Sequence, residues 1–173
     1  MQKALFLDRD GVINVEVNYL HKIEDFKFID GIFDLCKYYI NLGFIIIVVT
    51  NQSGIARGYY TEKDFNILTL WMISEFKKKG IEIKRVYYCP HHPNFSAKCS
   101  CRKPEAGMLL EAKKDFNIDL KKSIMIGDKE RDIEASLNAG LHESYLFDES
   151  RSIEISKATK IIDKLEDIYN ANT

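Results

Sequence analysis

Short apolar runs alternate with amphipathic stretches along the chain. The apolar runs lie at residues 3–8, 44–50, 85–89, 123–128 and 144–147. The run at residues 44–50 is continuously apolar and rich in β-branched residues, which is typical of a strand covered on both faces. Apolar residues at helical spacing mark residues 31–43, 61–80, 105–116, 130–139 and 160–169. Strands that alternate with helices predict an α/β domain, in which helices cover both faces of one parallel sheet.

Composition limits the classes of protein to which this chain can belong. Its 173 residues, 46% of them hydrophobic, fit a single domain over residues 1–173. The net charge of −1 disfavours nucleic acid as a partner. The longest apolar run is too short to span a membrane, and MQKALFLDRDG lacks the layout of a signal peptide. We expect a cytoplasmic protein, a monomer, with no membrane partner and with frayed residues only at 170–173.

Polar residues follow four of the predicted strands. They are Asp8-Arg9-Asp10-Gly11, Thr50-Asn51-Gln52-Ser53-Gly54, the loop that starts at Cys89, and Gly127-Asp128-Lys129. Ligands of open α/β sheets bind outside the carboxyl ends of the strands. The sequence therefore predicts one site at this edge of the sheet.

Three carboxylates, those of Asp8, Asp10 and Asp128, are expected at this edge. They would repel one another without a divalent cation, and their oxygen atoms suit Mg²⁺. Thr50 adds a hydroxyl group and Lys103 adds a compact positive charge. Such a set meets the needs of phosphoryl transfer, which are a nucleophile, charge neutralisation and fixed donors. The alternative is that Asp8 and Asp10 merely end a strand and cap a turn.

A second group of candidate metal ligands lies in the loop of residues 89–101. Cys89, His91, Cys99 and Cys101 form a Cys₃His set that suits tetrahedral zinc, and His92 is a spare candidate. A closed set of four ligands leaves no position for substrate, so this zinc is expected to be structural. The loop has little apolar content with which to order itself, and zinc would fix the direction of the Arg102 and Lys103 that follow. The alternative is a loop with free thiols.

Four motifs of the chain resemble, in order, those of the haloacid-dehalogenase (HAD) superfamily of phosphatases. They are FLDRDGVIN, VVTNQSGIARG, CRKP and MIGDKERDI. The resemblance implies a Rossmann-like HAD core in which Asp8 is the nucleophile and forms an aspartyl-phosphate. It implies that Asp10 is the acid/base and that Thr50 and Lys103 hold the phosphoryl oxygens. Mg²⁺ would be bound by the Asp8 and Asp128 carboxylates and the Asp10 backbone carbonyl, and Asp132 would support Lys129 or the metal shell.

The intervals between these motifs are too short for a cap domain of the usual size. Loops must then select the substrate, and Arg102 would act at the catalytic centre as well as in binding. The predicted substrate contacts are Glu16, Val17, Asn18, Tyr19, Asn51, Gln52, Ser53, Arg102, Lys103 and Lys129.

Within the superfamily, DRDGVIN followed by Tyr19, TNQSGIARG and RKPEAGML resemble the D-glycero-D-manno-heptose 1,7-bisphosphate 7-phosphatases. The chain departs from that pattern at Glu16-Val17-Asn18, where the family often has Asp-His-Gly. The resemblance implies removal of the 7-phosphate of this sugar bisphosphate during synthesis of nucleotide-activated heptose. Histidinol-phosphate phosphatases and other small-molecule HAD phosphatases are the alternative. Two further hypotheses are disfavoured. The absence of an excess of basic residues argues against a polynucleotide 3′-phosphatase, and the presence of Asp8, Asp10 and Asp128 argues against a non-catalytic binding module.

Overall fold

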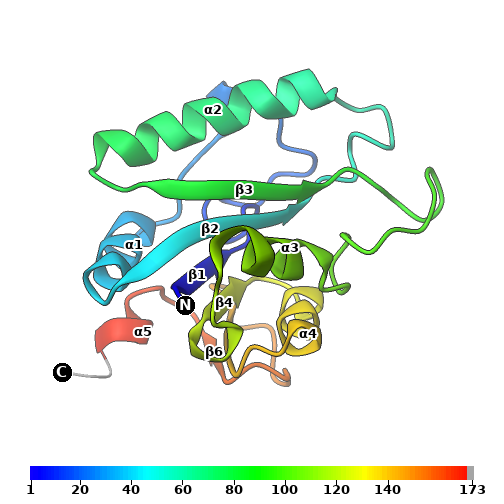
Figure 1. Ribbon diagram of the computed structural model, residues 1–173. Coiled ribbons are helices and arrows are strands. Elements are labelled where there is room, and N and C mark those ends of the chain that lie inside the picture. The colour runs from blue at the N-terminus through cyan, green and yellow to red at the C-terminus, as the bar shows by residue number, and fades with distance from the viewer. Residues whose placement is uncertain (171–173) are drawn as a thin grey trace.

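A computed structural model describes residues 1–170; of the residues expected to fray, 171–173 lie outside the described part. Six parallel strands form one sheet with the order β3-β2-β1-β4-β5-β6 (Figure 1). They are β1 (Lys3–Leu7), β2 (Phe44–Asn51), β3 (Ile83–Cys89), β4 (Ile124–Gly127), β5 (Glu143–Phe147) and β6 (Lys160–Ile162). The strand order changes direction between β1 and β4, which is where ligands of such sheets bind.

Helices cover both faces of the sheet, as the sequence predicts. The helices are α1 (Ile32–Asn41), α2 (Glu62–Lys78), α3 (Gly107–Phe116), α4 (Glu130–Ala139) and α5 (Asp167–Asn170), with short 3₁₀ turns at Ile23–Asp25 and Leu120–Lys122. Alternate residues of a strand enter different cores. Leu5 and Leu7 of β1 pack with α1 and α2, whereas Ala4 and Phe6 pack with α3 and α4. Figure 1 shows α3 and α4 together on one side of the sheet.

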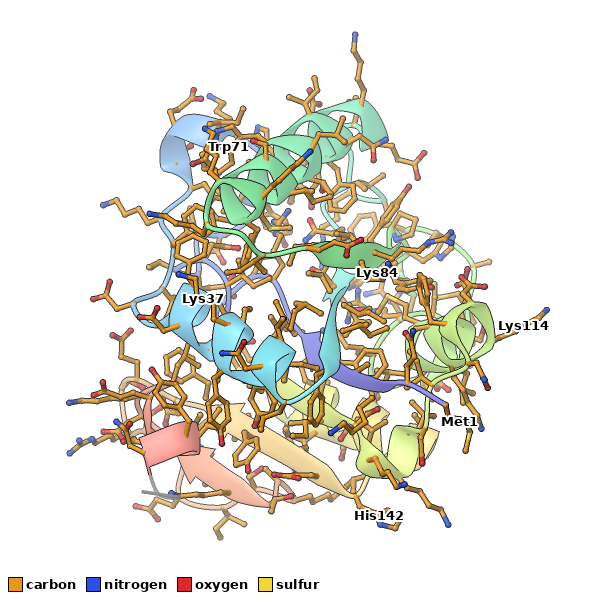
Figure 2. All side chains as sticks on the ribbon, turned by 60° about the vertical axis from the view of Figure 1, so that its left-hand side comes forward. Met1, Lys37, Trp71, Lys84, Lys114 and His142 are labelled. Carbon is orange, nitrogen blue, oxygen red and sulfur yellow. The ribbon has the colours of Figure 1, made fainter. Side chains whose placement is uncertain are left out.

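The helix boundaries follow from local chemistry. Thr61 and Asp64 form the capping box that starts α2, with the Asp64 amide donating to the Thr61 hydroxyl at 3.1 Å. Gly140 takes the left-handed conformation that ends α4. Aromatic contacts then fix α2 to the segment before α1, because Trp71 packs against Phe26 and Phe28. Figure 2 shows Trp71 on α2.

The predicted final helix at residues 160–169 is wrong. Residues 160–162 instead form β6, which pairs with β5, and only Asp167–Asn170 are helical. The β-branched pair Ile161-Ile162 can extend the sheet and bury Ile162 in the core. Leu165 and Ile168 are buried as well, at a spacing that also fits one helix. Short apolar runs of this kind do not distinguish strand from helix by period alone.

Connections between the strands are short. The interval between β1 and β2 holds one 3₁₀ turn and α1, and the interval between β2 and β3 holds α2. In the described chain no cap domain is inserted between the strands, which confirms the prediction. None of the described helices is long and apolar enough to cross a membrane. The loop after β3 extends beyond the carboxyl ends of the strands (Figure 1), so it can border a site there.

Candidate functional site

The centre of the site is a buried ion cluster at the ends of β1 and β4. The Nζ atom of Lys103 lies 3.0 Å from Oδ1 of Asp8 and 2.7 Å from Oδ1 of Asp132, and it donates to the Val49 carbonyl at 2.8 Å. The backbone amide of Arg9 donates to Asp8 at 2.7 Å. These contacts orient Asp8 and place the Lys103 ammonium between two carboxylates and a backbone carbonyl. Asp132, predicted to support Lys129 or the metal shell, contacts the Lys103 ammonium and accepts from the Lys129 backbone amide at 3.0 Å.

Acidic charge exceeds basic charge in this cluster. Burial raises the pKa of Asp8 well above its ordinary value; Lys103 lowers it, and the charges of Asp132 and Asp128 raise it further. Burial also raises the pKa of Asp128, whose Oδ1 atom is buried without a hydrogen-bond partner. Carboxylate oxygens of Asp8, Asp128 and Asp132 lie within 4.8 Å of one another. This donor set fits a divalent cation with oxygen ligands, which would supply the missing positive charge.

Gly11 makes this arrangement possible. A Cβ atom at this position would lie 2.4 Å from the Asp128 carboxyl group. Its φ of 85° also lies in the region that favours glycine. The glycine after the Asp-Arg-Asp sequence therefore lets β1 and β4 bring their acids together.

Asp10 is held by three side chains. Arg9 donates to both of its carboxylate oxygens, with Nη2 at 2.9 and 3.0 Å. Asn14 donates to Oδ1 at 3.1 Å, and Gln52 donates to Oδ2 at 2.9 Å. Arg9 is only 1% exposed and its guanidinium carbon lies 5.8 Å from the centre of the Phe65 ring, so Asp10 neutralises its buried charge. Sequence analysis did not assign Arg9 or Asn14, although an arginine between two acids was an available signal.

The polar side-chain atoms of Gln52 contact Asp10 and two other residues of the site. Its side-chain amide also donates to the Thr50 hydroxyl at 2.9 Å, while its carbonyl accepts a 2.5 Å hydrogen bond from Tyr60. Gln52 is 2% exposed, so its polar atoms are engaged within the protein. The predicted substrate contact at Gln52 is therefore better described as a positioning residue for Asp10 and Thr50.

A cavity of about 380 Å³ opens above this centre. Its lining includes Asp8, Asp10, Glu16, Asn18, Tyr19, Asn51, Gln52, Ser53, Arg102 and Lys129, all predicted from the sequence. Val17, also a predicted substrate contact, is 41% exposed and lies outside this lining. Thr50, Lys103 and Asp128 are buried below or beside the cavity. The strand ends therefore bring nearly all of the predicted residues to one place.

Arg57, at the end of the loop of residues 51–57 that was expected to help select the substrate, also lines the cavity, and so do Tyr60 and Arg131, which sequence analysis did not assign. Arg131 occupies the first turn of α4, whose N-terminus lies at the carboxyl edge of the sheet. That position was an available signal, because helix N-termini attract anions. Tyr60 lacks such a signal, since its role depends on a side-chain contact with Gln52 across a loop.

The second metal-ligand group lies in the loop after β3. Ligand atoms of Cys89, His91, Cys99 and Cys101 lie within 4.8 Å of one another. Sγ of Cys89 lies 3.5 Å from Sγ of Cys99, and Nδ1 of His91 lies 3.4 Å from Sγ of Cys101. Ligands of a tetrahedral zinc with bonds of ~2.3 Å are separated by similar distances, whereas the Sγ atoms of Cys89 and Cys101 lie closer together, at 2.8 Å. The residues can therefore hold a zinc ion, and His91 rather than His92 belongs to the group, as predicted.

The acidity of one of the three thiols suits metal binding, whereas burial raises the pKa of the Cys89 and Cys101 thiols. Burial raises the pKa of Cys99, but a hydrogen bond from the Arg102 backbone amide and the adjacent thiols lower it to about 7. The thiolate is the form that binds zinc. At least one ligand is thus ready to lose its proton near neutral pH.

The loop is linked to the cavity at its end. Arg102 donates from Nη1 to the His91 carbonyl at 3.1 Å. The Lys103 backbone amide donates to Oδ1 of Asn51 at 3.0 Å, and the Asn51 side-chain amide donates back to the Lys103 carbonyl at 3.1 Å. A Cβ atom on Gly107 would lie 2.2 Å from the Ser100 carbonyl, so glycine lets the loop pack against the start of α3.

Comparisons with known proteins agree with this site. Residues 100–167 match the HAD-hydrolase-like family. D-glycero-alpha-D-manno-heptose-1,7-bisphosphate 7-phosphatase of Campylobacter jejuni is 52% identical over 149 residues, covering 86% of this chain and 84% of that protein. The D-glycero-beta-D-manno-heptose-1,7-bisphosphate 7-phosphatase of Yersinia pestis is 48% identical over 143 residues, covering 80% and 76%.

A solved structure extends the likeness over the whole fold. The D,D-heptose 1,7-bisphosphate phosphatase of B. bronchiseptica, complexed with magnesium and phosphate, has a TM-score of 0.85 and 25% identity. The match covers 99% of this chain and 98% of that chain. Given the identity and coverage of these relatives, the chain belongs to the D-glycero-D-manno-heptose-1,7-bisphosphate 7-phosphatase family of HAD-like hydrolases.

Proposed function

We propose that this protein is a phosphatase that removes the 7-phosphate of D-glycero-D-manno-heptose 1,7-bisphosphate and leaves the 1-phosphate in place. The observation that carries this proposal is the cavity itself, which has Asp8 and Asp10 among its lining residues together with Arg57, Arg102 and Arg131. Such a cavity can receive one phosphate for reaction and hold a second one. The two relatives named for the alpha and beta anomers are 52% and 48% identical, so both anomers are candidate substrates.

The chemistry follows from the two aspartates at the floor of the cavity. A carboxylate oxygen of Asp8 attacks the phosphorus of the 7-phosphate, and the bond to the sugar oxygen breaks. Asp10 donates a proton to that leaving oxygen, since an alkoxide is a poor leaving group. Asp10 then takes a proton from water as the water attacks the aspartyl-phosphate. Inorganic phosphate leaves, and Asp8 regains its carboxylate.

Buried donors would stabilise the charge that develops on the phosphoryl oxygens. Lys103 Nζ lies 3.0 Å from Asp8, so it is close to any phosphoryl group attached there. The Thr50 hydroxyl accepts from Gln52, which leaves its own proton free for a phosphoryl oxygen. Lys103 also stays charged, because Asp132 and Asp8 outweigh the effect of burial and raise its pKa.

Two metal ions have separate roles in this proposal. Mg²⁺ would be held by Asp8, Asp128 and the backbone carbonyl of Asp10, where it supplies positive charge against the phosphoryl group. Zinc would be held by Cys89, His91, Cys99 and Cys101, where it orders the loop before Arg102. The unpartnered Oδ1 of Asp128 supports the first site, and the convergence of four ligand atoms supports the second.

Substrate choice would depend on the walls of the cavity. A phosphate on a primary carbon can reach the recessed Asp8 without the opening of a cap. The retained phosphate would meet Arg102 and Lys129. Lys129 is paired with Asp128 at 2.9 Å, so Arg102 is the freer of the two cations. A cytoplasmic location and a monomeric state stay predictions.

A phosphate-release assay with Mg²⁺ tests the proposal. The substrates are both anomers of the heptose bisphosphate, the heptose 7-monophosphate and histidinol phosphate. We expect the highest kcat/KM for a heptose bisphosphate, with one phosphate released per molecule and the sugar 1-phosphate as product. Faster turnover of histidinol phosphate would reject the heptose assignment and leave only the phosphatase.

The Tyr60–Gln52 contact gives a second prediction. Replacing Tyr60 with phenylalanine leaves the buried Gln52 carbonyl without its donor, so the amide that positions Asp10 and Thr50 loses its fixed orientation. We expect kcat to fall by about 5- to 50-fold, which corresponds to about 1–2 kcal/mol, while KM changes little. The matched control is Tyr59→Phe at the next residue, which is 55% exposed and should behave as wild type. A rise in KM of about 5- to 50-fold with kcat unchanged would show that Tyr60 binds substrate instead.

A further inference from the structure

Arg57 lies in an unusual setting at the wall of the cavity. Its guanidinium carbon is 4.7 Å from the centre of the Phe95 ring and 5.9 Å from the centre of the Tyr19 ring. Nη2 lies 3.0 Å from Nε2 of His92, close enough to donate to the neutral ring. Nε is buried and has no hydrogen-bond partner among the described residues. Phe95 and His92 belong to the loop of residues 89–101, so this loop contacts Arg57 as well as carrying Arg102.

Charge pairing separates the arginines of the chain into two groups. Arg9, Arg85 and Arg151 each have an aspartate within 4.0 Å. Within residues 1–170, Arg57, Arg102 and Arg131 have no such carboxylate, and these are the three that line the cavity. A guanidinium that lacks an anionic partner in the protein can take one from a ligand. The cavity is therefore lined by three guanidinium groups that are available to bind an anionic ligand.

The surroundings of Arg57 are suited to binding phosphate. Aromatic rings hold a guanidinium by its face and leave its edge, where the N–H groups point, free to donate. Guanidinium edges match phosphate oxygens in a bidentate geometry. Among the described residues, Nη2 of Arg57 meets only the neutral His92 ring and Nε has no partner, so no carboxylate of the protein uses these N–H groups.

From these contacts we propose that Arg57 is a specificity-determining residue that binds the retained phosphate together with Arg102, and that Phe95 and His92 position it. The inference rests on the proposed function, because it assumes a substrate with a second phosphate. It gives the loop of residues 89–101 two routes to the substrate. One is through Arg102, which is fixed to the His91 carbonyl, and the other is through the ring of Phe95.

The test measures the ratio of kcat/KM for the heptose bisphosphate to that for the heptose 7-monophosphate. Arg57→Ala should lower this ratio about 10- to 100-fold, as expected for loss of a charged hydrogen-bonded contact. Phe95→Ala keeps the charge but removes the ring, and should lower the ratio about 2- to 5-fold. Phe95→Tyr keeps the ring and should have the wild-type ratio.

Arg85→Ala is the matched control. Arg85 also lies over an aromatic ring, 5.1 Å from the centre of Tyr87, but it is paired with Asp115 and lies outside the cavity lining. Its ratio should equal that of wild type. An unchanged ratio in Arg57→Ala, or an equal loss on both substrates, would overturn the proposal. If Arg57→Ala fails to fold, a wild-type ratio in Phe95→Ala would overturn it.

The wild-type protein separates this inference from the proposed function. If another sugar bisphosphate is the better substrate, the heptose assignment fails, and the same ratio is then measured with that bisphosphate and its monophosphate. If the wild-type protein shows no preference for any bisphosphate over its monophosphate, the role of Arg57 is overturned. The two failures are thus distinct results.

Discussion

Replacing Asp8 with asparagine should abolish phosphate release while the fold is retained. An amide cannot attack phosphorus, and loss of a covalent nucleophile costs about 10⁴-fold or more in kcat. Asp10→Asn should be slowed less, by about 10²- to 10⁴-fold, which is the usual effect of losing a general acid–base, and it also removes the charge partner of the buried Arg9. Both changes keep the size of the side chain, so packing around the site is preserved.

Stability should move in the opposite direction to activity in Asp8→Asn. Burial raises the folded-state pKa of Asp8 above its unfolded value. A carboxyl group with a raised pKa binds its proton more tightly in the folded state, so its ionisation opposes folding as pH rises. Asparagine removes this opposition, and Lys103 still has Asp132 as a partner. In metal-free buffer near pH 7, we expect a Tm equal to or above that of wild type.

The measurements are phosphate release with Mg²⁺ and thermal unfolding of the same preparations. Asp30→Asn is the matched control, since it makes the same chemical change at an exposed acid outside the cavity. It should keep wild-type activity. Near-normal turnover in Asp8→Asn would reject the covalent mechanism, and a large drop in its Tm would show that Asp8 is needed for folding.

Much of the fold could be predicted because period and end signals agree along most of the chain. The capping box at Thr61 and the glycine after residue 139 mark helix ends that the structure confirms. The final segment failed because Ile161, Ile162, Leu165 and Ile168 fit a helix by spacing, while the open edge of β5 offers pairing to a strand. That choice depends on a tertiary contact which the local pattern does not contain.

Part of the site could likewise be predicted from the sequence, and part could not. Asp8, Thr50 and Asp128 follow apolar strands, so the rule about carboxyl ends of parallel strands brings them together. Side-chain partners are harder to predict, because they depend on rotamers and loop geometry. Gln52 could be placed near the site, but its use of both amide atoms on Tyr60, Thr50 and Asp10 could not be read from spacing. The partner of Asp132 was missed for the same reason.

The structure also changes how the zinc loop should affect catalysis. From sequence, zinc was expected to fix the direction of Arg102 and Lys103. The structure adds contacts that hold Lys103 independently of the loop, because its backbone is bound by Asn51 of β2 and its ammonium is buried between Asp8 and Asp132. Arg102 depends more directly on the loop, through the His91 carbonyl. Loss of zinc should therefore weaken binding of the retained phosphate by Arg102 more than it slows the reaction at Asp8.

Cys99→Ser should lower both stability and preference for the bisphosphate. A metal bridge across residues 89–101 restrains the unfolded chain much as a cross-link does, and closing a loop of this size is worth about 3 kcal/mol. For a chain of 150–250 residues, each kcal/mol shifts the Tm by about 2–4 °C, so we expect a fall on the order of 10 °C. Elemental analysis should find about one zinc per chain in wild type and much less in the variant.

Activity on two substrates distinguishes the possible causes of that loss. If Asn51 and the buried ion pairs hold Lys103, the variant should keep most of its kcat/KM for the heptose 7-monophosphate below its lowered Tm, while its kcat/KM for the bisphosphate falls. Cys36→Ala is the matched control, because this buried cysteine lies in the core outside the metal group and should leave the zinc content unchanged. A wild type without zinc, together with an unaffected variant, would reject the zinc site. An equal fall in kcat/KM for both substrates would show that the position of Lys103 depends on the zinc loop.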